Sequence, residues 1–166
     1  MNRFWIAGLL LSAFAAPASA AYTSIYAGIQ LDNTTGGVML GYQINKTYAI
    51  EAQVSRTEIH LNNSGLSSDK NITAAGLSAL ALLPMKLEGG SNYYLFAKAG
   101  YERINKDETY SSPNSIVYNG TVTSSENRVI LGGGAQYDFY KSLSGRAGID
   151  IVGDTRSIYL SAIFKF

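Results

Sequence analysis

Apolar and polar residues alternate along most of the chain with a period of two. From Thr23 to Asp32, for example, the odd positions are mainly apolar and the even positions are polar or small. Such alternation places one kind of side chain on each face of a β-strand, because successive side chains point to opposite sides. The pattern predicts strands at residues 22–32, 37–45, 48–60, 72–86, 93–105, 126–139, 143–152 and 156–166. The chain is therefore predicted to be all-β, with eight antiparallel strands in an up-and-down meander.

The segment Ile72–Leu83 departs from this alternation, because it is almost continuously apolar and rich in Ala and Leu. These residues favour a helix, but the segment is too short to cross a membrane as one, and Pro84 ends it. We expect a strand here, since an odd number of strands would spoil the pairing of neighbours. Its inward face would then carry small residues (Ala, Gly or Ser) and leave space inside.

The connections between the predicted strands differ in length. Three are short (45–47, 87–92 and 140–142), two are compact (33–36 and 153–155), and two are long and polar (60–71 and 105–125). Asn45-Lys46-Thr47 predicts a tight hairpin, and Asn119-Gly120 predicts a protruding one. Short turns at one end and longer loops at the other are typical of a transmembrane β-barrel, in which the short turns face the periplasm.

The apolar face of the strands indicates a barrel in a membrane rather than in water. This face is nearly free of charge, with Arg56 and Arg103 only near the loop ends. Its aromatic residues gather beside the short turns, at Tyr42, Tyr48, Tyr93, Tyr137, Phe139 and Phe164. Such a girdle is expected at a membrane interface. We therefore expect the apolar face to meet lipid and the polar face to line the lumen.

The N-terminus has the three parts of a secretory signal peptide. Arg3 supplies a positive charge, Phe4–Ala16 is a short apolar run, and Pro17–Ala20 ends in Ala-x-Ala. These parts predict cleavage after Ala20. The expected domains are a signal peptide at residues 1–20 and a barrel at residues 21–166.

Composition excludes several classes of function. The chain contains no Cys and one His, so a disulfide framework, a thiolate metal site and a His-based metal cluster are ruled out. The formal net charge of +1 offers no basic field for nucleic acid. No cofactor is predicted.

The polar face carries four positive and four negative side chains. They are Lys98, Arg128, Arg146, Lys165, Glu51, Glu102, Asp138 and Asp150. An eight-stranded barrel is just wide enough for side chains to fill, so its charges must pair or keep water. The pattern favours a packed polar plug, and a switchable ion-pair gate is the alternative. Lys98 is expected to pair with Glu51, Glu102 or Asp150.

Candidate catalytic groups are few. His60 lies at a strand end or loop, where a pair with Ser55 or Ser64 would have no orienting acid at a defined spacing. The lumen carboxylates match the lumen cations in number, which favours ion pairs over acid–base catalysis. Gly132–Gly134 lacks the Lys-Ser/Thr and the helix of a phosphate-binding loop. Glycines in the strands are instead expected to leave room for large inward side chains, such as Tyr26, Tyr94, Phe96 and Tyr159.

The long segment 105–125 is the main candidate for recognition. Tyr110, Ile116, Val117 and Tyr118 stand among Ser, Asn, Thr and Gly. This composition is typical of adaptable binding loops. The alternative is a loop that only packs against the barrel mouth and shields it.

The terminal strand alternates to its end, with Phe164 and Phe166 on the apolar face. Together with the signal peptide, the eight strands and the two long loops, it resembles the OmpA-type, OmpX/Ail and opacity-protein families of small outer-membrane barrels. The resemblance is one of pattern and covers residues 21–166. It implies a monomer in the bacterial outer membrane, in contact with lipid and lipopolysaccharide. It also implies that the outer-membrane assembly machinery recognises Phe164 and Phe166.

For function, the resemblance implies a non-enzymatic, envelope-structural or adhesin-like protein that meets a host or cell-surface ligand through loops 60–71 and 105–125. A narrow, porin-like channel for ions or small molecules is the alternative. A lipid A-modifying enzyme is a second alternative, which the lack of a His-x-Ser spacing disfavours.

Overall fold

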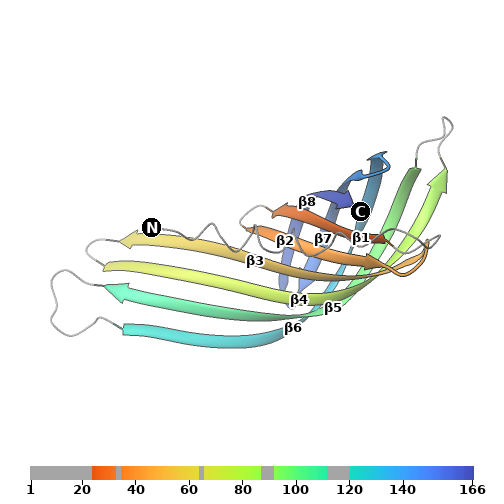
Figure 1. The fold of residues 1–166 in the computed structure, drawn as a ribbon. Coiled ribbons are helices and arrows are strands. Elements are labelled where there is room, and N and C mark those ends of the chain that lie inside the picture. The colour runs from red at the N-terminus through yellow and green to blue at the C-terminus, as the bar shows by residue number, and fades with distance from the viewer. Residues whose placement is uncertain (1–23, 33–34, 64–65, 87–91, 112–119) are drawn as a thin grey trace.

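The protein is a closed β-barrel of eight antiparallel strands (Figure 1). The computed structural model describes residues 24–32, 35–63, 66–86, 92–111 and 120–166. Each strand pairs with its neighbours in the sequence, and β1 pairs with β8 to close the barrel. The strands are β1 (Ser24–Asp32), β2 (Gly36–Gln43), β3 (Tyr48–Asn63), β4 (Leu66–Lys86), β5 (Asn92–Ser111), β6 (Gly120–Tyr140), β7 (Leu143–Val152) and β8 (Thr155–Lys165). The predicted fold class is confirmed.

Strands β3 to β6 are much longer than the sequence predicted. The pairing of β2 with β3 reaches Arg56, and that of β6 with β7 begins at Ile130. Beyond this level, β3 to β6 pair only with one another and extend past the rest of the barrel (Figure 1). We call residues 57–63, 66–72, 106–111 and 120–124 the protruding sheet.

The prediction of loops at 60–71 and 105–125 was therefore wrong for most of these residues. Hydrophobic alternation did not reveal these strands, because both faces of the protruding sheet are largely polar. They are held by continuous antiparallel pairing, which extends to Asn63↔Leu66 in one hairpin and Tyr110↔Gly120 in the other. Residues 116–118, part of the candidate recognition loop, lie outside the described residues, as does the predicted signal peptide at 1–20.

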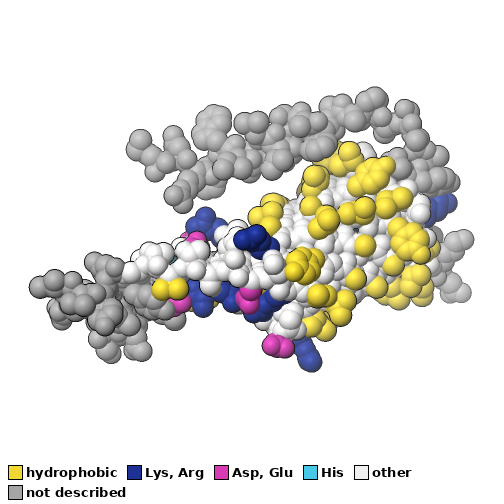
Figure 2. Space-filling model, turned by 90° about the horizontal axis from the view of Figure 1, so that it is seen from below, with side chains coloured by type: hydrophobic (Ala, Val, Ile, Leu, Met, Phe, Trp, Pro, Cys, Tyr) yellow, Lys and Arg dark blue, Asp and Glu magenta, His cyan; other side chains and the backbone are white. Residues whose placement is uncertain are grey.

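The outer surface of the barrel is apolar. Ile29 and Leu131 on this face are 53% and 54% exposed, whereas Lys98 and Arg146 inside are each 3% exposed. Figure 2 shows the apolar side chains spread over the barrel, with most of the visible charged ones nearer the protruding sheet. This inverted arrangement suits a hydrocarbon environment. Among the described residues, no helix has the length and hydropathy needed to cross a membrane.

Aromatic side chains mark the short-turn end of the barrel, where β2 meets β3 and β6 meets β7. Five of the predicted girdle residues are exposed there, namely Tyr42, Tyr48, Tyr137, Phe139 and Phe164. Tyr93 is half-buried. We call the opposite end, which carries the protruding sheet, the long-hairpin end.

Glycines on neighbouring strands admit large aromatic side chains into the narrow lumen. A Cβ atom on Gly41 would lie 1.9 Å from Cζ of Tyr26, and one on Gly148 would lie 2.9 Å from ring atoms of both Phe96 and Tyr159. The triple glycine has a different role. A Cβ atom on Gly132 would lie 2.1 Å from Oδ1 of Asp150, so this glycine makes room for a carboxylate and not for an aromatic ring.

The apolar strand β4 fills the lumen more than the sequence suggested. Ala74, Gly76 and Ser78 do present small groups inward toward the long-hairpin end. Leu80 and Leu82, however, also point inward and are 1% and 4% exposed. The expectation of an entirely small inner face was thus correct for only part of the strand.

Candidate functional site in the barrel lumen

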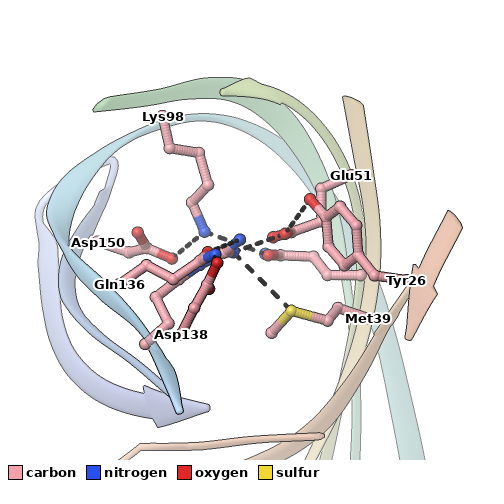
Figure 3. A network of polar contacts seen from close by, with 9 residues as sticks. Tyr26, Met39, Glu51, Lys98, Gln136, Asp138 and Asp150 are labelled. Carbon is pink, nitrogen blue, oxygen red and sulfur yellow. Dashed lines mark hydrogen bonds and ion pairs between the residues drawn. The ribbon is translucent and has the colours of Figure 1, made fainter. Parts of the chain in front are cut away.

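Five charged side chains meet in the interior of the barrel. Glu51 on β3, Lys98 and Glu102 on β5, and Arg146 and Asp150 on β7 are all buried. Each occupies an inward position in the alternation of its strand, which brings groups far apart in sequence together in the lumen. Figure 3 shows three of them, Glu51, Lys98 and Asp150, directed toward the middle of the lumen.

Arg146 forms the first of two ion pairs that cross the lumen. Its Nη1 lies 2.6 Å from Oε2 of Glu51, and this oxygen also accepts a hydrogen bond of 3.0 Å from the Tyr26 hydroxyl. Nε and Nη2 of Arg146 donate to Oε1 of Gln136 at 3.2 and 3.1 Å. The guanidinium carbon lies 5.1 Å from the centre of the Phe96 ring. Arg146 is thus held by hydrogen bonds and by an aromatic face.

Lys98 forms the second pair, with Oδ2 of Asp150. Nζ of Lys98 also donates to Oε1 of Gln53 at 3.3 Å, and Nε2 of Gln53 donates to Oε2 of Glu102 at 3.0 Å. The Tyr159 ring centre lies 5.2 Å from the same ammonium. Of the three carboxylates considered for Lys98, Asp150 is therefore the direct partner, whereas Glu102 is reached through an amide.

The remaining members of the predicted network lie toward the two ends of the barrel. Asp138 accepts from Lys165 at 2.7 Å and from Gln136 at 3.3 Å, so it joins the Arg146 cluster through Gln136. Arg128 lies apart from this cluster. Its Nη2 is 2.8 Å from Oε1 of Glu126, toward the long-hairpin end.

Sequence reasoning missed the neutral links, Gln53 and Gln136, and the rim pair formed by Lys106 and Glu126. Gln53 and Gln136 occupy inward positions of the sequence alternation, but a count of charges gives them no role. Lys106 and Glu126 were placed in a loop or at a strand start. Their pairing could have been found only by extending the strand alternation into polar sequence.

Two separate cavities lie on either side of the ion pairs. A cavity of about 510 Å³ opens at the long-hairpin end, and Gln53, Glu102 and Asp150 contribute to its lining. A cavity of about 10 Å³, enough for roughly one water molecule, lies at the other side and is lined in part by Tyr26, Gln136 and Arg146. In the described part of the chain the ion pairs lie between these cavities as a plug.

The candidate catalytic groups are not brought together. His60 lies on the outer face of the protruding sheet, and its Nδ1 is 2.7 Å from Oδ1 of Asp69. This hydrogen bond raises the pKa of His60 above its usual value. Ser55, by contrast, points inward and lines the large cavity, and Ser64 lies outside the described residues. Within the described residues, no group of three or more His, Cys, Asp or Glu could hold a metal ion.

Solved structures with the same fold come from several bacteria. The N-terminal β-barrel domain of Pseudomonas aeruginosa OprF is 15% identical, with a TM-score of 0.58 over 87% of this chain and 96% of that one. A major outer membrane protein from Thermus thermophilus is 15% identical, with a TM-score of 0.57 over 89% and 100%. Neisserial surface protein A is 15% identical, with a TM-score of 0.51 over 87% and 96%.

No protein-family model matches the sequence, and no curated protein matches it either. At 15% identity, the structural likeness establishes the fold alone. The chain has the fold of the small eight-stranded barrels of bacterial outer membranes.

Proposed function

We propose that this chain is a non-enzymatic, monomeric protein of the bacterial outer membrane that acts at the cell surface through its protruding sheet. The observation that carries this proposal is that β3 to β6 extend beyond the other four strands of the barrel (Figure 1). With the protruding sheet outside the cell, the short turns face the periplasm, as is usual for outer-membrane barrels. The plug of two ion pairs favours an interaction role over transport.

The apolar outer surface of the barrel supports the proposal that the protein lies in the outer membrane. Exposed aliphatic side chains would contact lipid tails, and the exposed aromatic residues would lie among the headgroups. Lipopolysaccharide is the expected lipid at the outer rim. Phe164 and Phe166 are exposed on the outer face at the short-turn end, where the assembly machinery would meet them before β8 closes against β1.

The edge of the protruding sheet supports the interaction part. Residues 120–128 of β6 pair with β5, and the pairing of β6 with β7 begins only at Ile130. Thr121, Val122 and Thr123 are exposed on this edge and favour an extended backbone. An edge strand of this kind can receive an extended segment of a partner protein by backbone pairing. A host or bacterial surface protein is therefore the proposed partner.

The proposal can be tested by shortening the protruding sheet at register pairs. Asp107 and Thr123 are partners in the β5–β6 ladder, so residues 108–122 can be replaced by an Asn-Gly turn. Ile59 and Lys70 are partners in the β3–β4 ladder, which allows the same replacement of residues 60–69. Cells that carry both replacements should lose adhesion to host cells or matrix, while the variant Lys141→Glu at the short-turn end should retain it. Undiminished adhesion of the shortened barrel would contradict the proposal.

A narrow channel is the second candidate function. It is favoured by the observation that charged or amide side chains line the lumen at several levels, from Asp138 through Gln136 and Gln53 to Glu102. Conduction would require both ion pairs to separate, because they lie between the two cavities. Current through the protein in a planar lipid bilayer distinguishes this function from surface interaction.

A further inference from the structure

The large cavity at the long-hairpin end has the size of a small-molecule site. Its volume of about 510 Å³ falls within the range usual for such sites. Ile72 and Ile104, on β4 and β5, contribute an apolar wall, and Thr35 and Ser157 contribute hydroxyl groups. The cavity therefore offers both apolar contact and hydrogen bonds to an occupant.

The floor of this cavity is rich in hydrogen-bond acceptors. Asp150 is 4% exposed, and its Oδ1 has no hydrogen-bond partner, although its Oδ2 is paired with Lys98. Oε1 of Gln30, another lining residue, also has none. Glu102 accepts a hydrogen bond from Gln53. Two carboxylates thus face one ammonium, and the floor keeps a net negative charge.

The rim of the cavity has the opposite charge. Nζ of Lys106 and Nη2 of Arg128 both contact the same oxygen, Oε1 of Glu126. Two cations therefore share one carboxylate, which leaves a net positive charge. Lys106 lies four residues beyond Glu102 on the same face of β5, a rise of roughly 13 Å along the strand. Arg128 is the register partner of Glu102, but its Nη2 extends to Glu126, so the cavity runs from a negative floor to a positive rim.

We propose that this cavity binds a small zwitterion, with a primary ammonium at one end, a carboxylate at the other and a short hydrocarbon chain between them. The ammonium has three donors and one positive charge, which match the two carboxylates of Glu102 and Asp150 beside the single Lys98. The carboxylate meets Lys106 and Arg128 at the rim. The hydrocarbon chain packs against Ile72 and Ile104.

The test uses the full barrel folded in detergent micelles, with isotope-labelled isoleucine methyl groups observed by NMR. The probes are ε-aminocaproate, hexylammonium, which lacks the carboxylate, and hexanoate, which lacks the ammonium. We expect saturable shifts of the Ile72 and Ile104 signals with ε-aminocaproate, and at least tenfold weaker binding of each of the other two probes. Charge-assisted hydrogen bonds are strong enough for such a difference.

The variant Glu102→Gln keeps the size of the side chain but removes the negative charge. It should weaken ε-aminocaproate binding about tenfold or more. The matched control is Asp154→Asn, which removes an exposed carboxylate in the turn between β7 and β8 and should leave binding unchanged. If Glu102→Gln fails to fold, Lys106→Gln at the rim tests the other end, and it should weaken ε-aminocaproate without affecting hexylammonium.

Several results would overturn the proposal. They are the absence of saturable shifts at the two isoleucines, equal binding of either monofunctional probe, and unchanged affinity in a folded Glu102→Gln variant. Equal loss of binding in Asp154→Asn would also overturn it, because the effect would then reflect the general field at this end of the barrel.

Discussion

Arg146 on β7 and Glu51 on β3 join across the lumen, with Nη1 and Oε2 2.6 Å apart. Both side chains are almost fully buried, so each charge depends on the other. Removing one member of such a pair typically costs about 3–5 kcal/mol, because the remaining charge is left buried without a partner.

Arg146→Ala should therefore destabilise the barrel by about 3–5 kcal/mol. Adding Glu51→Gln to it should restore part of this loss, since the orphaned carboxylate is then neutral. Urea unfolding of the protein in lipid vesicles measures both effects. Strict additivity of the two substitutions would show that the two groups do not interact in the membrane-embedded protein.

The pair formed by Lys98 and Asp150 should be energetically coupled in the same way. Lys98→Ala combined with Asp150→Ala should cost less than the sum of the single changes, whereas coupling with Glu51, which is bound to Arg146, should be weaker. Single-channel recording checks the plug in parallel. Lys98→Ala should raise the conductance if a freed carboxylate admits water, and conductance identical to that of the unmodified protein would argue against a role for Lys98 in closing the lumen.

Gly41, which packs against the ring of Tyr26, should not tolerate a side chain. Gly41→Ala places a Cβ atom 1.9 Å from Cζ of Tyr26, so the ring must shift away from Glu51. We expect a loss of about 1–3 kcal/mol, as for other overpacked interiors. The control is Gly120→Ala, because no atom lies within 4 Å of the new Cβ. Equal stability of the two variants in urea would contradict this account.

Charges on the two faces of the barrel should have different costs. Leu131 is 54% exposed on the outer face. Leu131→Arg should cost roughly 2–4 kcal/mol if that face meets the lipid interior. Ser55→Arg, whose side chain enters the large cavity, should cost less. Refolding yields into lipid vesicles over a urea series give the order, and the reverse order would refute the assignment of the outer face to lipid.

The pair of His60 and Asp69 gives a pH-dependent contact on the protruding sheet. Asp69 raises the pKa of His60, so the contact stabilises the folded state at low pH and is lost as pH rises through the folded pKa. Asp69→Asn should return the pKa to near its usual value of about 6.5. NMR titration of the imidazole is unambiguous because the chain has one histidine. Asp107→Asn, on the same outer face, should leave the pKa unchanged.

The alternation of apolar and polar residues is enough to predict the number of strands and which residues face inward. Both follow from the period of two, which can be recognised in a short stretch of sequence wherever one face of a strand is apolar. Tyr48 to Val54 in β3 is an example. The same alternation predicts that charges of both signs share the lumen, because Glu51, Lys98 and Arg146 occupy inward positions of their own strands.

The length of β3 to β6 was decided only in the tertiary structure. The segment around Thr121 and Thr123 has no apolar face, and its strand depends on pairing with β5. The choice of partners for the buried cations was also decided there. Whether Lys98 meets Asp150 or Glu51 depends on the stagger of strands around the closed barrel and on the reach of Gln53 between them. A period-two pattern states which face a residue occupies, but the height at which two distant strands bring their side chains together is set by barrel closure.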